Sequence, residues 1–185
     1  MLNARNARIV AVMMAVFLYP GGSLAAGKAM PLPVSAMPGE GRGLSLAVQA
    51  QVTLKEHLFQ KYRDMAVISD DQYRITQAAI RDNRAHQTPL HTSELLFNKC
   101  MHDRRYSEAA ITASLAVLDS STPVDRARFT LLQAEACILR QDDVHAVQPL
   151  LHQAASELAA ESRHDAAWQQ ARAMLDELQS GLSFS

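Results

Sequence analysis

Glycine is almost absent from the greater part of this sequence. Six of the seven glycines lie at or before Gly43, and the seventh is Gly181. Tight hairpin turns usually need Gly or Asn at positive φ, and the only asparagines between residues 44 and 180 are Asn83 and Asn98. Loops that cradle phosphate need glycine for close backbone approach. The shortage therefore argues against a β-rich fold and against a nucleotide-binding loop.

Aromatic residues are also few, at 5% of the chain, whereas 48% of the residues are apolar. This composition suits packed helices better than a sandwich or barrel, and it is too apolar for general disorder. The formal net charge is −1, and without residues 1–25 it is −3, from 16 Lys and Arg against 19 Asp and Glu. We therefore expect neither nucleic acid nor an anionic membrane as a partner.

Residues 1–25 have the pattern of a signal peptide. Arg5 and Arg8 precede an apolar run from Ile9 to Tyr19, and Ser23-Leu24-Ala25 places small residues before a cut after Ala25. The run is too short to span a bilayer comfortably, and the absence of a cysteine at the cut excludes lipid attachment there. We expect an exported, periplasmic protein with no stable membrane insertion after cleavage. The alternative is an uncleaved amphipathic or membrane-anchoring start.

Residues 26–43 are rich in Pro and Gly and predict a flexible linker. A plain spacer is the simplest interpretation, and a docking strand for a partner is the alternative. Residues 44–182 then predict one all-α domain. Its signals include possible capping boxes at Thr53–Glu56 and Ser69–Gln72, a Thr122-Pro123 helix start, a kink or late start at Pro149 and a stop at Gly181. Apolar spacing predicts helices over 44–65, 69–84, 92–101, 108–118, 122–138, 144–158 and 162–178.

Two of these predicted hairpins can be superimposed with an offset of 37 residues. Ala109 then aligns with Ala146, and Cys100 aligns with Cys137. Tyr106, Ala109 and Ala116 match the aromatic-x-x-Ala…Ala pattern of the tetratricopeptide (TPR) repeat, so residues 92–158 resemble a degenerate pair of such repeats. The second copy matches less well, because Asp143 stands where the aromatic residue belongs. A generic helical bundle is the alternative fold.

The TPR resemblance implies a short solenoid whose stacked first helices form a concave, protein-binding surface. The polar or large first-helix residues that would contact a partner are Asn98, Lys99, His102, Gln133 and Arg140; alternatively, these are ordinary solvated side chains. The same alignment would place Cys100 and Cys137 on neighbouring helices. That placement suggests a disulfide in an exported protein, and two buried free thiols are the alternative.

The sequence contains no motif that supports catalysis or metal binding. It has seven histidines but no His-x-x-x-His or His-Glu-x-x-His pattern, and it lacks a Gly-x-Ser-x-Gly elbow and a Cys-x-x-Cys pair. We expect no enzyme, cofactor or metal. The expected function is that of a periplasmic interaction module: an adaptor, pilotin or chaperone-like factor that serves an envelope assembly such as a secretion system or pilus. The alternatives are a structural subunit of such a machine and a small helical periplasmic hydrolase.

Overall fold

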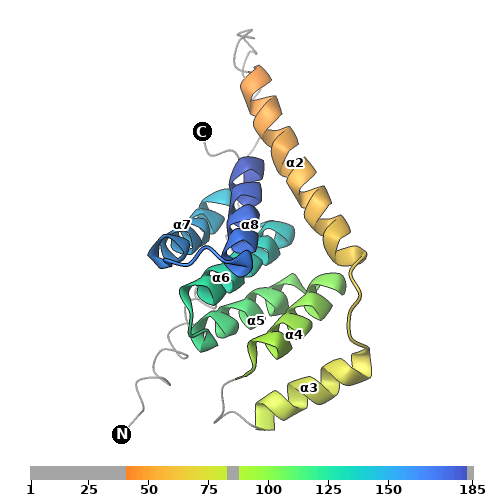
Figure 1. Cartoon of the computed structure of the whole chain (residues 1–185). Coiled ribbons are helices and arrows are strands. Elements are labelled where there is room, and N and C mark those ends of the chain that lie inside the picture. Colours follow the sequence, from red (N-terminus) through yellow and green to blue (C-terminus); the bar gives the residue numbers. More distant parts are fainter. Residues whose placement is uncertain (1–40, 83–87, 183–185) are drawn as a thin grey trace, which may run out of the picture. The chain divides into compact units, whose positions relative to one another are not determined.

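The computed structural model describes residues 41–82 and 88–182, with side chains from residue 46 onward. These residues form an all-α structure without strands, which confirms the predicted fold class (Figure 1). The signal peptide and most of the linker lie outside the described residues. The helices are α2 (Gly41–Arg63), α3 (Asp70–Asp82), α4 (Leu90–His102), α5 (Tyr106–Asp119), α6 (Pro123–Arg140), α7 (Val144–Ala160) and α8 (Ala166–Leu182).

Helices α4 to α8 pack mainly against their neighbours in sequence. Helix α5 packs on α4 and α6, α6 packs on α7, and α8 packs on α7 and α6. The buried faces of α5 and α6 are rich in alanine, including Ala109, Ala113, Ala134 and Ala136. Small side chains allow the axes of these helices to approach closely. Van der Waals contacts between atoms close to the two backbones therefore hold the helices together.

Helix α2 crosses this stack and packs against α4, α6 and α8 (Figure 1). Its second half contributes Leu54, Leu58 and Tyr62 to the core. The Tyr62 ring meets the Phe97 ring of α4 edge to face, with 5.9 Å between centroids. In the alignment of the predicted hairpins, α4 and α6 are the first helices. The chain's own α2 therefore covers the surface that the resemblance assigns to a partner.

The ends of α4 and α6 have the same backbone geometry 37 residues apart. The Arg105 N–H donates to the Cys100 carbonyl over 2.8 Å, and the Asp142 N–H donates to the Cys137 carbonyl over 3.0 Å. The residue before each donor is left-handed, with φ of 61° at Arg104 and 70° at Gln141. Each helix thus ends in a Schellman motif, and the internal repeat seen in the sequence corresponds to a repeated turn.

Two of the predicted helix starts are confirmed. Ser69 accepts a hydrogen bond from the Gln72 N–H over 3.2 Å, and Thr122 accepts one from the Asp125 N–H over 3.0 Å. The predicted capping box at Thr53 is wrong, because Thr53 lies inside α2 and its hydroxyl donates to the Gln49 carbonyl. Of the two alternatives predicted for Pro149, the late start is wrong, because α7 begins at Val144 and Pro149 lies inside it.

Gly181 is the last residue but one of α8, which ends at Leu182, so the predicted stop is correct to within one residue. A Cβ atom built on this residue would lie 2.8 Å from the Cβ and Cδ2 atoms of Leu54 on α2. That separation is shorter than real side chains allow, so the glycine permits α2 and α8 to approach each other closely. The sequence predicted only the helix end at this glycine, and its role in packing α2 against α8 was missed.

Across residues 41–82 and 88–182, no helix combines the length and apolar character that crossing a bilayer requires.

Replacing Gln141 with glycine should stabilise the protein. A left-handed backbone costs a residue with a side chain about 1–2 kcal/mol, and part of that gain is offset by the greater freedom of glycine in the unfolded chain. We expect the free energy of unfolding in urea to rise by about 0.5–1 kcal/mol. Gln169→Gly is the matched control inside α8, and it should lower the same quantity by about 1 kcal/mol. A loss of stability in both variants would contradict the cap assignment.

Candidate functional site

The five sequence-predicted partner-binding residues fall into three places. Asn98 on α4 and Gln133 on α6 are half-buried. Lys99 and His102, at the end of α4, both contact Asp103. Arg140 is exposed at the end of α6, where it pairs with Asp142. The structure therefore brings Lys99 and His102 together at Asp103, whereas Arg140 lies apart from them at Asp142.

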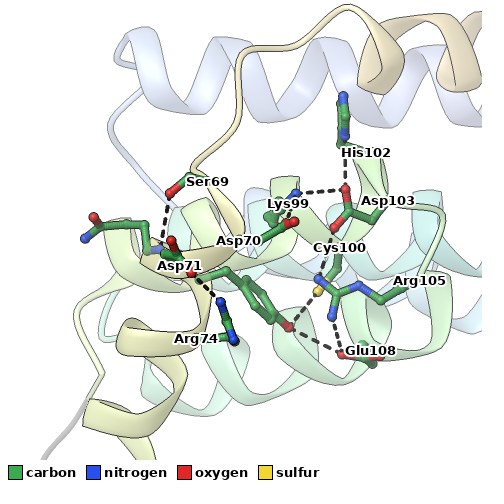
Figure 2. Close-up of polar contacts among 12 residues, drawn as sticks. Ser69, Asp70, Asp71, Arg74, Lys99, Cys100, His102, Asp103, Arg105 and Glu108 are labelled. Atoms are coloured by element: carbon green, nitrogen blue, oxygen red, sulfur yellow. Dashed lines mark hydrogen bonds and ion pairs between the residues drawn. The ribbon is translucent and has the colours of Figure 1, made fainter.

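Lys99 is an internal tether between α3 and α4 (Figure 2). Its side chain is only 10% exposed, and its Nζ lies 2.7 Å from Asp70 Oδ1 and 3.0 Å from Asp103 Oδ1. Hydrogen bonds to these two carboxylates raise the Lys99 pKa above its ordinary value, so the ammonium stays charged. Asp70 begins α3 and Asp103 follows α4, so a single cation joins the two helices. The charge of Lys99 is engaged within the chain.

Asp103 contacts two cations, Lys99 and Arg105, and the His102 ring at the turn after α4. Its Oδ1 lies 3.1 Å from His102 Nδ1, and its Oδ2 lies 3.3 Å from Arg105 Nη2. Burial alone would raise the pKa of this carboxyl, but His102, Lys99 and Arg105 outweigh that effect and hold it below 3.8. The carboxylate is therefore ionised at neutral pH and fixes the turn between α4 and α5.

Tyr73 is the buried anchor of α3. Its hydroxyl lies 3.3 Å from Cys100 Sγ and donates to Glu108 Oε2 over 3.3 Å, and the Arg105 guanidinium lies 4.4 Å from the ring centroid. Burial, followed by the neighbouring Cys100 thiol, raises the Tyr73 pKa well above its ordinary value. The phenol thus remains a neutral hydrogen-bond donor. One aromatic side chain, one ion pair and one cation–π contact hold α3 in place.

Both cysteines are free and buried, so the structure does not contain the predicted disulfide. The Cys100 thiol points toward Tyr73 of α3, whereas Cys137 lies at the end of α6 beside Arg140, 3.9 Å from its Nη2. Helix α5 packs on both α4 and α6, and the two thiols serve separate contacts. Burial, assisted by Asp142, raises the Cys137 pKa to about 12, and burial also raises the Cys100 pKa. Neither thiol is a ready nucleophile at neutral pH.

Glu135 is a buried charged residue that the sequence analysis missed. It is 1% exposed in the middle of α6. Lys61 Nζ lies 2.9 Å and 3.0 Å from its two carboxylate oxygens, and the Tyr62 hydroxyl donates to Oε2. Burial and the adjacent carboxylate hold the Tyr62 pKa well above 10. The signal that could have revealed it is an acid between Ala134 and Ala136 within an apolar stripe.

An open pocket of about 390 Å³ lies between the turns that follow α4 and α6. Its cationic lining consists of Arg104, Arg105 and Arg140, and the remaining lining residues are Tyr106, Ser107, Glu108, Leu139 and Gln141. The two Schellman turns position this lining, because Arg104 and Gln141 are their left-handed residues. Of the three arginines, the sequence analysis predicted only Arg140 as a partner-binding residue. Arg104 and Arg105 were missed because the fold, and not their spacing in the sequence, brings them to Arg140.

The three arginines have different partners. The Arg104 guanidinium lies 4.7 Å from the centre of the Phe59 ring. Arg105 Nη1 lies 3.1 Å from Glu108. Arg140 is held by Asp142 on two sides, because its Nε donates to Oδ1 over 2.8 Å and its Nη2 donates to Oδ2. Its Nη1 group is the part of the guanidinium that Asp142 leaves for a ligand. The pocket therefore offers planar donors that suit carboxylate groups.

Within residues 41–82 and 88–182, no three histidine, cysteine or acidic side chains come together in a way that could hold a metal ion. No family model matches the chain, and neither a curated protein nor a solved structure matches it. The TPR resemblance therefore stays a prediction.

Replacing Lys99 with methionine should loosen α3 while the rest of the fold persists. The variant keeps the aliphatic stem but loses both carboxylate contacts, so α3 retains chiefly Tyr73 as its anchor. We expect faster amide hydrogen exchange across residues 70–82, with exchange in α6 unchanged. Arg74→Met is the matched control, because Arg74 pairs with the exposed Asp71 within α3 itself and joins no second helix through that contact. Equal effects of the two changes would show that Lys99 is no tether.

The Cys137 thiol predicts a loss of stability in alkali. Above pH 9.0 the unfolded chain releases this proton, whereas the folded chain keeps it until about pH 12. The unfolded state then binds fewer protons, so the free energy of unfolding falls as pH rises through this window, by up to roughly 1.4 kcal/mol per pH unit. Cys137→Ala should remove this part of the slope in urea unfolding between pH 8 and pH 11. Parallel slopes for the two proteins would contradict the prediction.

Proposed function

We propose that the protein is an exported interaction module that binds an acidic segment of another envelope protein. The observation that carries this proposal is the open pocket lined by Arg104, Arg105 and Arg140. Arginine forms paired, planar hydrogen bonds with carboxylates, which gives both attraction and orientation. The proposal retains Arg140 as a partner-binding residue and adds Arg104 and Arg105.

The position of α2 supports placing the partner at this pocket. The second half of α2 packs across α4, α6 and α8, so a partner would have to displace Leu54, Leu58 and Tyr62 from the core to reach that surface. The pocket needs no such displacement, because it lies open at the ends of α4 and α6. A partner segment could dock there on the folded domain without large rearrangement.

The leader pattern supports the cellular setting of this proposal. Export with cleavage after Ala25 would deliver the domain to the periplasm. There it would act as an adaptor or chaperone-like factor for an envelope assembly such as a secretion system or a pilus. A segment rich in Asp and Glu on such an assembly is the ligand that the pocket chemistry favours.

Site-specific cross-linking from Ser107 tests the proposal, because this residue is exposed and lines the pocket. We replace it with a photoreactive amino acid in the protein produced in its own cells, and we recover the chain from the periplasm with Ala26 expected as its first residue. A discrete adduct should form and should be lost when Arg104→Glu and Arg140→Glu are combined. Arg172→Glu is the matched control on α8, where Arg172 pairs with Asp176, and it should leave the adduct intact.

A binding measurement with a defined probe accompanies the cross-linking. Fluorescent hexaglutamate should bind the purified protein in a salt-dependent manner. The combined Arg104→Glu and Arg140→Glu variant should bind it at least about tenfold more weakly, since each lost charged hydrogen bond is worth about 1.5–3 kcal/mol. No adduct from Ser107, or equal hexaglutamate binding by all variants, would overturn the proposal.

A further inference from the structure

Helix α5 carries an exposed apolar stripe on its outer face. Ile111, Leu115 and Leu118 follow one another at helical spacing and are 38–44% exposed. The opposite face of α5, through Ala109, Ala113 and Ala116, is fully buried against the neighbouring helices. Large apolar side chains grouped on one helical face are typical of a surface that another element covers.

The first half of α2 carries a second exposed apolar face. Leu54 lies against Gly181 and His57 Nε2 lies 3.1 Å from Glu177 Oε1, so α2 and α8 run antiparallel. Helix α8 ends at Leu182, and α2 continues past this end (Figure 1). Within this continuing part, Val48 and Val52 lie one turn apart and are 57% and 56% exposed. Lys55 follows on the same face, and it is half-buried.

The spacing of the two faces matches when the helices run antiparallel. Along α5, Glu108 is followed by Ile111 after three residues and by Leu115 after four more. Backward along α2, Lys55 is followed by Val52 after three residues and by Val48 after four more. Antiparallel docking therefore places Val52 beside Ile111 and Val48 beside Leu115. It also brings the Lys55 ammonium toward Glu108, a carboxylate that already accepts from Arg105 and Tyr73.

One copy cannot make this contact with itself, because α5 packs on α4 and α6 whereas α2 packs across α4, α6 and α8. We propose that the first half of α2 docks antiparallel on the α5 stripe of a second copy of this chain. A single contact of two helical turns is small beside the roughly 800 Å² per partner of a stable interface. The reciprocal arrangement has α2 of each copy on α5 of the other, which doubles the buried area and closes the pair under twofold symmetry.

Sedimentation of the exported protein over a wide concentration range tests the reciprocal dimer. We expect a concentration-dependent dimer that Val48→Glu or Leu115→Glu each weakens at least about tenfold, since each change buries a carboxylate in an apolar contact. Ile75→Glu is the matched control, because Ile75 is 65% exposed on α3 and lies outside both faces. It should leave the dimer unchanged. Both test positions are exposed, and circular dichroism checks that each variant remains folded.

A covalent cross-link gives a second, independent measurement. Combining Val48→Cys with Leu115→Cys should yield a disulfide-linked dimer on mild oxidation, while the native thiols stay protected by burial. Ile75→Cys combined with Leu115→Cys should yield no disulfide-linked dimer under the same conditions, because Ile75 lies outside both faces. A monomer at every concentration, a dimer that tolerates both glutamate variants, or equal cross-linking of the control pair would each overturn the proposal.

Discussion

The buried carboxylate of Glu135 sets the position of α2 and, through it, much of the arrangement. An ionised group in the middle of α6 is costly unless donors reach it, and Lys61 and Tyr62 of α2 supply them. Once these contacts fix where α2 crosses α6, Leu58 and Leu54 fall into the core one and two turns earlier. Leu54 then meets Gly181, so the same crossing determines how α8 packs. The first half of α2 lies beyond these contacts, so its side chains Val48 and Val52 stay exposed.

A helix lying across a stack of hairpins changes where partners can bind. The surface formed by α4, α6 and α8 is apolar, and α2 covers it. Without α2, Phe97 and other core residues would be exposed to solvent. The groups that carry the two proposed contacts lie at the edges of this stack. They are the arginines between the turns after α4 and α6, and the exposed apolar faces of α2 and α5. The two kinds of surface differ in chemistry, since the arginine pocket is cationic and the faces of α2 and α5 are apolar. If both proposals hold, the domain presents one cationic and one apolar surface to its partners.

The sequence predicted the elements well and their tertiary contacts poorly, for a physical reason. Helix periodicity, the Ser69 and Thr122 caps and the 37-residue offset are local or repetitive, so they can be identified in the chain itself. The pairing of Glu135 with Lys61 and the meeting of Arg104 with Arg140 depend on the fold. Thr53 shows the limit of local signals: its residue type favours a helix start, yet α2 continues through it. Gly181 lies next to the end of α8, as predicted, but its contact with Leu54 could not be foreseen from the sequence. The expected disulfide between Cys100 and Cys137 is also not present. Equivalent positions in a repeat need not face each other, and the sequence does not show which way each thiol points.

The placement of α2 also has a kinetic consequence. The contacts among α4 to α7 join segments close in sequence, so they can form early and quickly. Tyr62 reaches Glu135 across 73 residues, and Leu54 reaches Gly181 across well over a hundred. Synthesis delivers α2 first, yet its binding surface is complete only when α8 has emerged. During that interval the docking site for Leu54, Leu58 and Tyr62 is incomplete. We therefore expect the docking of α2 to be a late step of folding, because its contacts have the greatest sequence separation.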